Sequence, residues 1–130
     1  MSQSLQTLKL KLNYDPIDND HEEFVSLISE LQHVSNVEFP TKFNELLLHV
    51  EQHFDRENKL MEQYGFPATS EHQAEHYRVL SDLKQFKQRV DQGRIAFARA
   101  YCKDTAMGWF DLHVEGMDSA LVAHIRSKGE

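Results

Sequence analysis

The chain has 130 residues, a size typical of one domain with its own hydrophobic core. Its formal net charge of −7 argues against nucleic acid or an anionic membrane surface as a partner. A single cysteine, Cys102, excludes an intramolecular disulfide and suits a reducing compartment. No apolar run has the length of a signal-peptide core or a membrane span, so we expect a cytoplasmic protein.

The first predicted helix follows an irregular N-terminal arm, residues 1–13. Asp15 is a suitable N-cap and Pro16 fits a first turn, so the helix is expected to begin there. Apolar residues then recur at alternating steps of three and four, the period of one helix face, as far as about Asn36. His21 lies within this apolar face.

The second and third predicted helices form a hairpin. An apolar stripe covers residues 43–64, and the Gly-Phe-Pro sequence at 65–67 ends that helix. Ser70 and Gln73 have the spacing of a capping box, which predicts the start of a third helix that runs to about Asp91.

Two pairs of potential metal ligands lie in this hairpin, His53 with Glu57 and His72 with His76. The members of each pair are four residues apart, so on a helix they lie one above the other, about 5–6 Å apart at Cβ. Because one pair ends a helix and the other opens the next, all four side chains are expected at one level.

The last stretch keeps a helical period over residues 95–121, with a break expected around 103–104. His113 and Asp118 in its closing part are five residues apart, which separates them by about 140° on an ideal helix. We therefore expect a local widening, such as a π-type turn, near Gly116, where the missing side chain eases distortion.

No segment shows strand alternation. Four amphipathic helices joined by short links predict an all-α protein, an antiparallel up-down-up-down four-helix bundle over residues 14–130. In such a bundle the start of the first helix lies beside the end of the second, the start of the third and the end of the fourth. The residues expected to meet there in the core are His21, His53, Glu57, His72, His76, His113 and Asp118.

A metal centre is the interpretation that accounts for all of these residues at once. One histidine in an apolar stripe is usually a hydrogen-bonded core residue, but seven ionisable groups at one level are costly to bury without a cation. Seven ligands are too many for one tetrahedral zinc and fit two metals bridged by carboxylates. Imidazole with carboxylate suits iron, and ligand type alone leaves manganese open.

The sequence resembles a known protein family. Over residues 13–126 it is similar to hemerythrins, in particular to the single-domain bacterial form. The motifs that carry the resemblance are Ile17-Asp18-x-x-His21, His53-Phe54-x-x-Glu57-x-x-Leu60-Met61, Pro67 before His72-x-x-x-His76, and Trp109-x-x-x-His113-x-x-x-x-Asp118.

The resemblance implies a non-haem di-iron centre bridged by two carboxylates and an oxo or hydroxo group. It implies an oxygen carrier, for storage or delivery, and not an enzyme; O2 would be held as hydroperoxide at the iron that keeps an open position. The implied ligands are His72, His76 and His113 for one iron, His21 and His53 for the other, and Glu57 and Asp118 as bridges.

Two alternatives to an oxygen carrier stay open at this stage. The first is a sensor of O2 or redox state; sensors of this family usually carry an output module, for which 130 residues leave no room. The second is a di-iron enzyme that handles peroxide or nitric oxide. Oxygen-activating di-iron proteins use two Glu-x-x-His motifs on facing helices, and this chain does not contain two such motifs. The expected partners are O2 and a protein acceptor of O2 that the sequence does not identify.

The sequence departs from the common family pattern at three positions, Asp20, His49 and Asn58, none of which is an implied ligand. His49 lies one turn before His53. Plain core packing is the favoured expectation for this residue, and a hydrogen bond to a ligand or to an ordered water is the alternative.

Four further positions carry structural expectations. Trp109 and Met61 are expected to pack beside the ligands and to wall the open position. His124 is expected to be a partly buried residue at the helix end, and His33 to lie on the surface.

Overall fold

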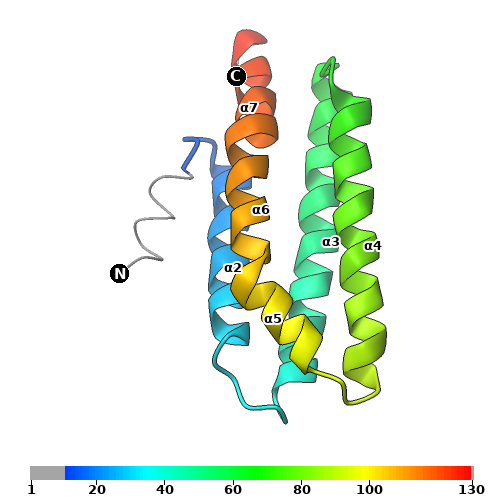
Figure 1. Ribbon diagram of the computed structural model, residues 1–130. Coiled ribbons are helices and arrows are strands. Elements are labelled where there is room, and N and C mark those ends of the chain that lie inside the picture. Colours follow the sequence, from blue (N-terminus) through cyan, green and yellow to red (C-terminus); the bar gives the residue numbers. More distant parts are fainter. Residues whose placement is uncertain (1–10, 130) are drawn as a thin grey trace.

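The computed structural model describes residues 11–129, and over these residues the chain is helical with no strand. The helices are α2 (Asp15–Leu31), α3 (Phe39–Tyr64), α4 (Thr69–Asp91), α5 (Ala96–Asp104), α6 (Ala106–His113), the π-helix η1 (Val114–Asp118) and α7 (Ser119–Ser127). The last four follow one another in a single arm beside α2, α3 and α4, and successive arms alternate in direction (Figure 1). The predicted all-α bundle is confirmed. No helix in this part of the chain is long and apolar enough to cross a membrane.

The start of α2 differs from the prediction in its cap. Pro16 lies in the first turn as expected, but Tyr14 is the N-cap residue and no side chain caps the helix. Asp18 is turned back instead, and its carboxylate accepts hydrogen bonds from the backbone N–H groups of Leu12 (2.8 Å) and Tyr14 (3.1 Å). These bonds tie residues 11–14, which are not helical, to the bundle; residues 1–10 of the predicted arm lie outside the described residues.

The first helix also ends earlier than predicted, at Leu31 instead of Asn36. Leu31 and Phe39 are both fully buried, whereas most of the residues between them are exposed. The chain must reverse between these two anchors, so the polar residues up to Asn36 form the turn and not a further helical turn.

The hairpin between α3 and α4 is built differently on its two sides. Gly65 adopts the left-handed conformation (φ 59°) that ends a helix, as the sequence predicts. The predicted capping box of Ser70 and Gln73 is wrong, because α4 begins at Thr69, two residues earlier than Ser70 as N-cap requires, and its N-cap residue Ala68 makes no side-chain cap. The Thr69 hydroxyl instead donates a hydrogen bond to the Phe66 carbonyl at 2.6 Å.

The fourth arm shows both predicted irregularities. It breaks at Thr105, directly after the predicted residues 103–104. The π-helix from Val114 to Asp118 contains Gly116, so the predicted local widening is confirmed. The wider turn brings Asp118 to the same inner face as His113, which regular α-helical geometry would not do.

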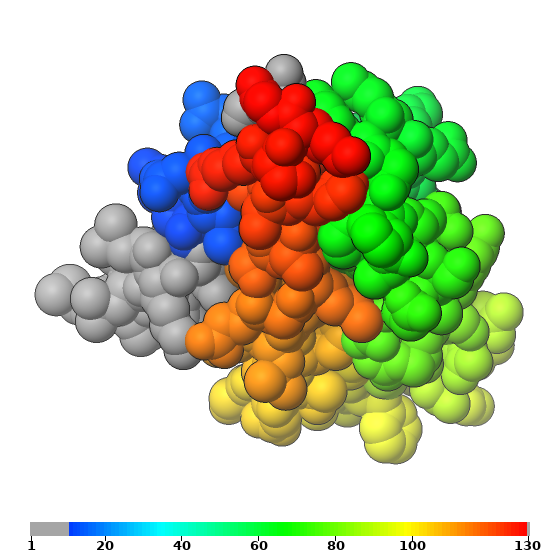
Figure 2. All heavy atoms as spheres, turned by 90° about the horizontal axis from the view of Figure 1, so that it is seen from above, coloured from blue at the N-terminus to red at the C-terminus, as the bar shows by residue number. Residues whose placement is uncertain are grey.

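The core consists of two apolar clusters with polar residues between them. The larger cluster includes Phe24, Phe54 and Val114, and the smaller is Ile17, Met61, Leu121, Val122 and Ile125. Along α2, α3 and the fourth arm, buried polar residues stand between members of the two clusters: His21 between Ile17 and Phe24, Glu57 between Phe54 and Met61, and Asp118 between Val114 and Leu121. Figure 2, a view from above Figure 1, shows α7 and the α3–α4 turn side by side at this end of the bundle.

Cys102 is a free, fully buried core residue, and burial raises the pKa of its thiol to about 12. Because the thiolate is the reactive form, we expect the folded protein not to react with a disulfide reagent such as DTNB at pH 8. The same protein unfolded in guanidinium should react with one equivalent. Rapid release of the reagent's coloured thiolate by the native protein would show that the thiol is accessible.

Candidate metal centre

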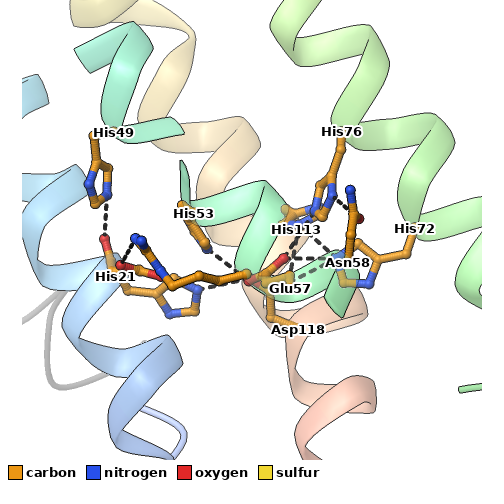
Figure 3. Close-up of polar contacts among 11 residues, drawn as sticks. His21, His49, His53, Glu57, Asn58, His72, His76, His113 and Asp118 are labelled. Atoms are coloured by element: carbon orange, nitrogen blue, oxygen red, sulfur yellow. Dashed lines mark hydrogen bonds and ion pairs between the residues drawn. The ribbon is translucent and has the colours of Figure 1, made fainter. Parts of the chain in front are cut away.

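The structure brings all seven predicted side chains together in the core between the two apolar clusters (Figure 3). None of these residues is more than 4% exposed. The bundle arms contribute them as the antiparallel order requires: His21 from α2, His53 and Glu57 from α3, His72 and His76 from α4, His113 from α6 and Asp118 from η1.

The donor atoms form two groups, in each of which they lie within 4.8 Å of one another. The groups are Glu57, His72, His76 and His113, hereafter the three-histidine group, and His21, His53, Glu57 and Asp118, hereafter the two-histidine group. Glu57 belongs to both. One group therefore contains three imidazoles and the other two, and the two groups share the carboxylate of Glu57.

Glu57 directs one oxygen to each group. Its Oε2 atom lies 2.8 Å from Nε2 of His53, in the two-histidine group. Its Oε1 atom lies 3.0 Å from Nε2 of His76 and 3.3 Å from Nε2 of His72, in the three-histidine group. This is the arrangement of a carboxylate that bridges two cations.

Asp118 is placed in the same way on the opposite side. Its Oδ2 atom lies 2.8 Å from Nε2 of His21. Its Oδ1 atom lies 3.1 Å from Nε2 of both His72 and His113. Both carboxylates can thus reach both groups.

Several of these short distances are not hydrogen bonds. Oε1 of Glu57, Oδ1 of Asp118 and Nε2 of His76 have no hydrogen-bond partner in the described chain, although possible partners lie 3.0–3.3 Å away. Such atoms point to a common centre more than to one another. Two donor atoms about 2.1 Å from a cation and at right angles to each other are roughly 3.0 Å apart. The residues therefore fit a pair of bound cations.

The two carboxylates remain charged in spite of their burial. Burial and the nearby Asp118 act to raise the pKa of Glu57, but His53 and His72 outweigh them and lower it. Burial likewise opposes the charge of Asp118, and contact with His113 holds the pKa of that carboxyl well below its usual range. Burial acts to lower the pKa of His72, but Asp118 and Glu57 outweigh this effect and raise that pKa to about 9. Without a bound cation, protons on the histidines thus balance the negative charge of the two carboxylates.

His76, in the three-histidine group, is held in position by residues on the far side of its ring. The Nδ1–H group of His76 donates to Oδ1 of Asn58 at 3.2 Å, which leaves Nε2 directed to the metal centre. The ring of Phe54 stacks on His76 almost in parallel, with centroids 3.8 Å apart. Asn58 directly follows Glu57 in the sequence, so this partner could be suspected from its position alone.

The aromatic residue beside the two-histidine group differs from the prediction. Trp109 does pack beside a ligand, since its ring stacks on His113 with centroids 4.8 Å apart, but His113 belongs to the three-histidine group. The aromatic ring beside His21 is Phe110, whose edge-to-face contact has a centroid distance of 5.2 Å. Met61 is fully buried in the smaller apolar cluster. Sequence reasoning missed Phe110, which lies three residues before His113; Trp109 lies four residues before it, so helix spacing alone does not distinguish the two.

The histidines outside the two groups have other partners. Nε2 of His49 lies 3.0 Å from the backbone oxygen of Asp20, so its hydrogen bond goes to the residue before His21 and not to a member of the two groups. Nε2 of His124 donates to the Tyr64 carbonyl at 2.7 Å, and this histidine is partly buried as predicted. His33 is exposed, which confirms its surface position.

Comparison with known proteins gives two similarities. A family model described as the Hemerythrin HHE cation binding domain matches residues 12–126. The chain is also 25% identical over 81 residues to a bacteriohemerythrin of Campylobacter jejuni subsp. jejuni, an alignment that covers 58% of this chain and 61% of that protein. The chain therefore matches less than two thirds of that relative's length. No solved structure gives a significant match.

Proposed function

The chain belongs to the hemerythrin family, and from that premise we propose that its metal centre holds two iron ions and binds O2 reversibly. The observation that carries the proposal is the placement of Glu57 and Asp118, each of which directs one oxygen to each histidine group. A family domain that binds cations and a buried cluster of histidine and carboxylate side chains support the metal.

The two cation positions are unequal in their protein donors. With both carboxylates shared, the three-histidine group offers five donors and the two-histidine group offers four. A six-coordinate ion beside His21 and His53 therefore has more room for an exogenous ligand, and we place O2 there. Mixed imidazole and carboxylate donors suit iron. When bound, two iron ions supply the electrons that O2 takes up and returns.

The chain's own contribution is to keep this position dry. Phe110 contacts His21 and stacks on Phe24 with a centroid distance of 4.3 Å, so apolar rings cover that side of the two-histidine group. An apolar wall slows the arrival of water and protons at the bound ligand. This favours release of O2 unchanged, so we propose a binding protein, for storage or delivery, and not an enzyme.

The test is reversible oxygenation of the full chain. Loaded with two equivalents of Fe(II) under argon, the protein should be nearly colourless, and air should produce a visible absorption band. Removal of O2 should abolish the band over several cycles, with most of the iron recovered as Fe(II) by a ferrous-specific chelator. His53→Ala should lose both the band and iron, whereas the surface variant His33→Ala should lose neither.

A single exposure to air could instead convert all the iron irreversibly to Fe(III). If that conversion also oxidised an added substrate stoichiometrically, the carrier function would be replaced by an enzymatic one.

A further inference from the structure

One buried carboxylate lies next to the metal centre without belonging to it. Asp20 immediately precedes His21 on α2, and its side chain is only 11% exposed. Arg56 on α3 holds it with two nitrogens: Nε donates to Oδ2 at 2.8 Å and Nη2 donates to Oδ1. The backbone oxygen of the same residue accepts a hydrogen bond from Nε2 of His49, also on α3 (Figure 3). We call Asp20, His49 and Arg56 the α2–α3 clamp.

The position of the clamp on α3 relates it to the two-histidine group. His49 and Arg56 are seven residues apart, two turns of one helix face, and His53 lies between them on that face. The ring centroids of His49 and His53 are 5.9 Å apart. One face of α3 thus carries a ligand of this group and holds the residue beside the other ligand, His21.

We propose that the α2–α3 clamp is a positioning device, which fixes His21 against His53 and thereby sets the affinity of the two-histidine group for its cation. This inference rests on the proposed function, because it requires two bound ions. It concerns a bond network outside both donor groups, and it predicts an effect on one ion only.

The physical reason lies in the unequal exposure of the ion pair. The Arg56 side chain is 46% exposed, and an exposed pair by itself adds little to stability. Asp20, however, is nearly buried and is held by two parallel, charge-assisted hydrogen bonds. Without Arg56 this carboxylate would lack a cation and would turn toward solvent. The adjacent His21 would then lose its fixed position, because the two residues share one helical turn.

The three-histidine group has no such dependence. His72, His76 and His113 come from α4 and α6, and the clamp joins α2 to α3. His76 has its own support from Asn58. A change in the clamp should therefore separate the two cation sites, which a general loss of packing would not do.

The experiment is an anaerobic titration of the iron-free full chain with Fe(II) against a competing chelator. In Arg56→Met the weaker of two binding steps should show a dissociation constant raised roughly 10–100-fold, as expected for loss of an outer partner of a metal ligand. The tighter step should stay within about twofold. Arg56→Lys should restore part of the affinity, because an ammonium group keeps the charge without the two parallel bonds.

Lys59→Met is the matched control, since it removes the same charge from α3 by breaking the exposed Lys59–Asp55 pair (3.0 Å). It should leave both steps unchanged. If Arg56→Met does not fold, His49→Leu tests the second bond of the clamp, with His49→Gln retaining a donor and most of the affinity.

Two results with the variants would overturn the inference alone. One is unchanged affinity at both sites in Arg56→Met or His49→Leu while the wild type binds two ions, which would leave the proposed function intact. The other is an equal weakening of both sites together with the melting temperature, which would reduce the clamp to a general packing role. A wild-type chain with a single site would contradict the proposed function itself and this inference with it.

Discussion

Removal of the metal is expected to lower the melting temperature by on the order of 10–20 °C. Glu57 and Asp118 are 1% and 0% exposed, and both are charged at neutral pH. A cation whose free concentration is about a thousand times its dissociation constant adds roughly 4 kcal/mol to the free energy of unfolding. Calorimetry of iron-loaded, chelator-treated and reloaded protein measures the difference. Equal melting temperatures of loaded and chelated protein would contradict a metal that holds the core together.

The pH dependence of this difference has a definite sign. In the metal-free protein the pKa of His72 is raised to about 9 from 6.5, so its stabilising contribution is complete below pH 6.5 and is lost as the pH rises through 9. The pKa values of Glu57 and Asp118 are lowered, so their contribution is present above their ordinary values of 4.5 and 3.8 and is lost as the pH falls. The contributions of these three groups to the stability of the metal-free protein are therefore together largest between about pH 5 and 6.5, and the lowered pKa of His76, caused by burial, acts against them in that range.

Metal binding has the opposite dependence, because imidazole must lose its proton to bind. The gap between the melting temperatures of loaded and metal-free protein should widen from pH 6 to pH 9. It should close below about pH 5, where protons displace the iron. A gap that narrows between pH 6 and 9 would show that the imidazoles are not ligands.

The level at which the site residues meet could be predicted because it depends on local spacing and chain direction. His53 with Glu57 and His72 with His76 are pairs four residues apart on either side of a helix stop, and a hairpin places such pairs at one height. The π-helix was equally predictable. A separation of five residues cannot place His113 and Asp118 on one face of a regular helix, so the helix must widen.

Contacts between distant residues could not be predicted in the same way. Asp20 and Arg56 are 36 residues apart, and although Asp20 departs from the family pattern, nothing in the sequence pairs it with Arg56. Asp18 lies in the first turn of α2, where a negative charge is favourable, yet its carboxylate binds the backbone of the preceding segment. Adjacent residues on a helix point about 100° apart, so the difference between Trp109 and Phe110 as neighbours of His21 depended on the rotation of α6, which is set by tertiary packing.

The contact between Phe110 and His21 leads to the second prediction with a large expected effect. Phe110→Leu is expected to shorten the lifetime of the oxygenated protein roughly tenfold, which corresponds to a barrier lower by about 1.4 kcal/mol. The phenyl ring contacts His21 and fills the space between it and Phe24. A smaller side chain leaves room beside polar groups, which water can occupy, and water brings the protons that the wall excludes. The decay of the visible band in air-saturated buffer measures the lifetime.

The control separates a local opening from a weakened core. Phe43→Leu makes the same change at another fully buried position, near the start of α3 and about 15 Å along the helix from His53. It should lower the melting temperature by a similar amount and leave the lifetime unchanged. Trp109→Ala should shorten the lifetime less than Phe110→Leu, because its ring stacks on His113 in the other group. Equal shortening in Phe43→Leu and Phe110→Leu would mean that general loosening of the bundle, and not the wall beside His21, admits the water.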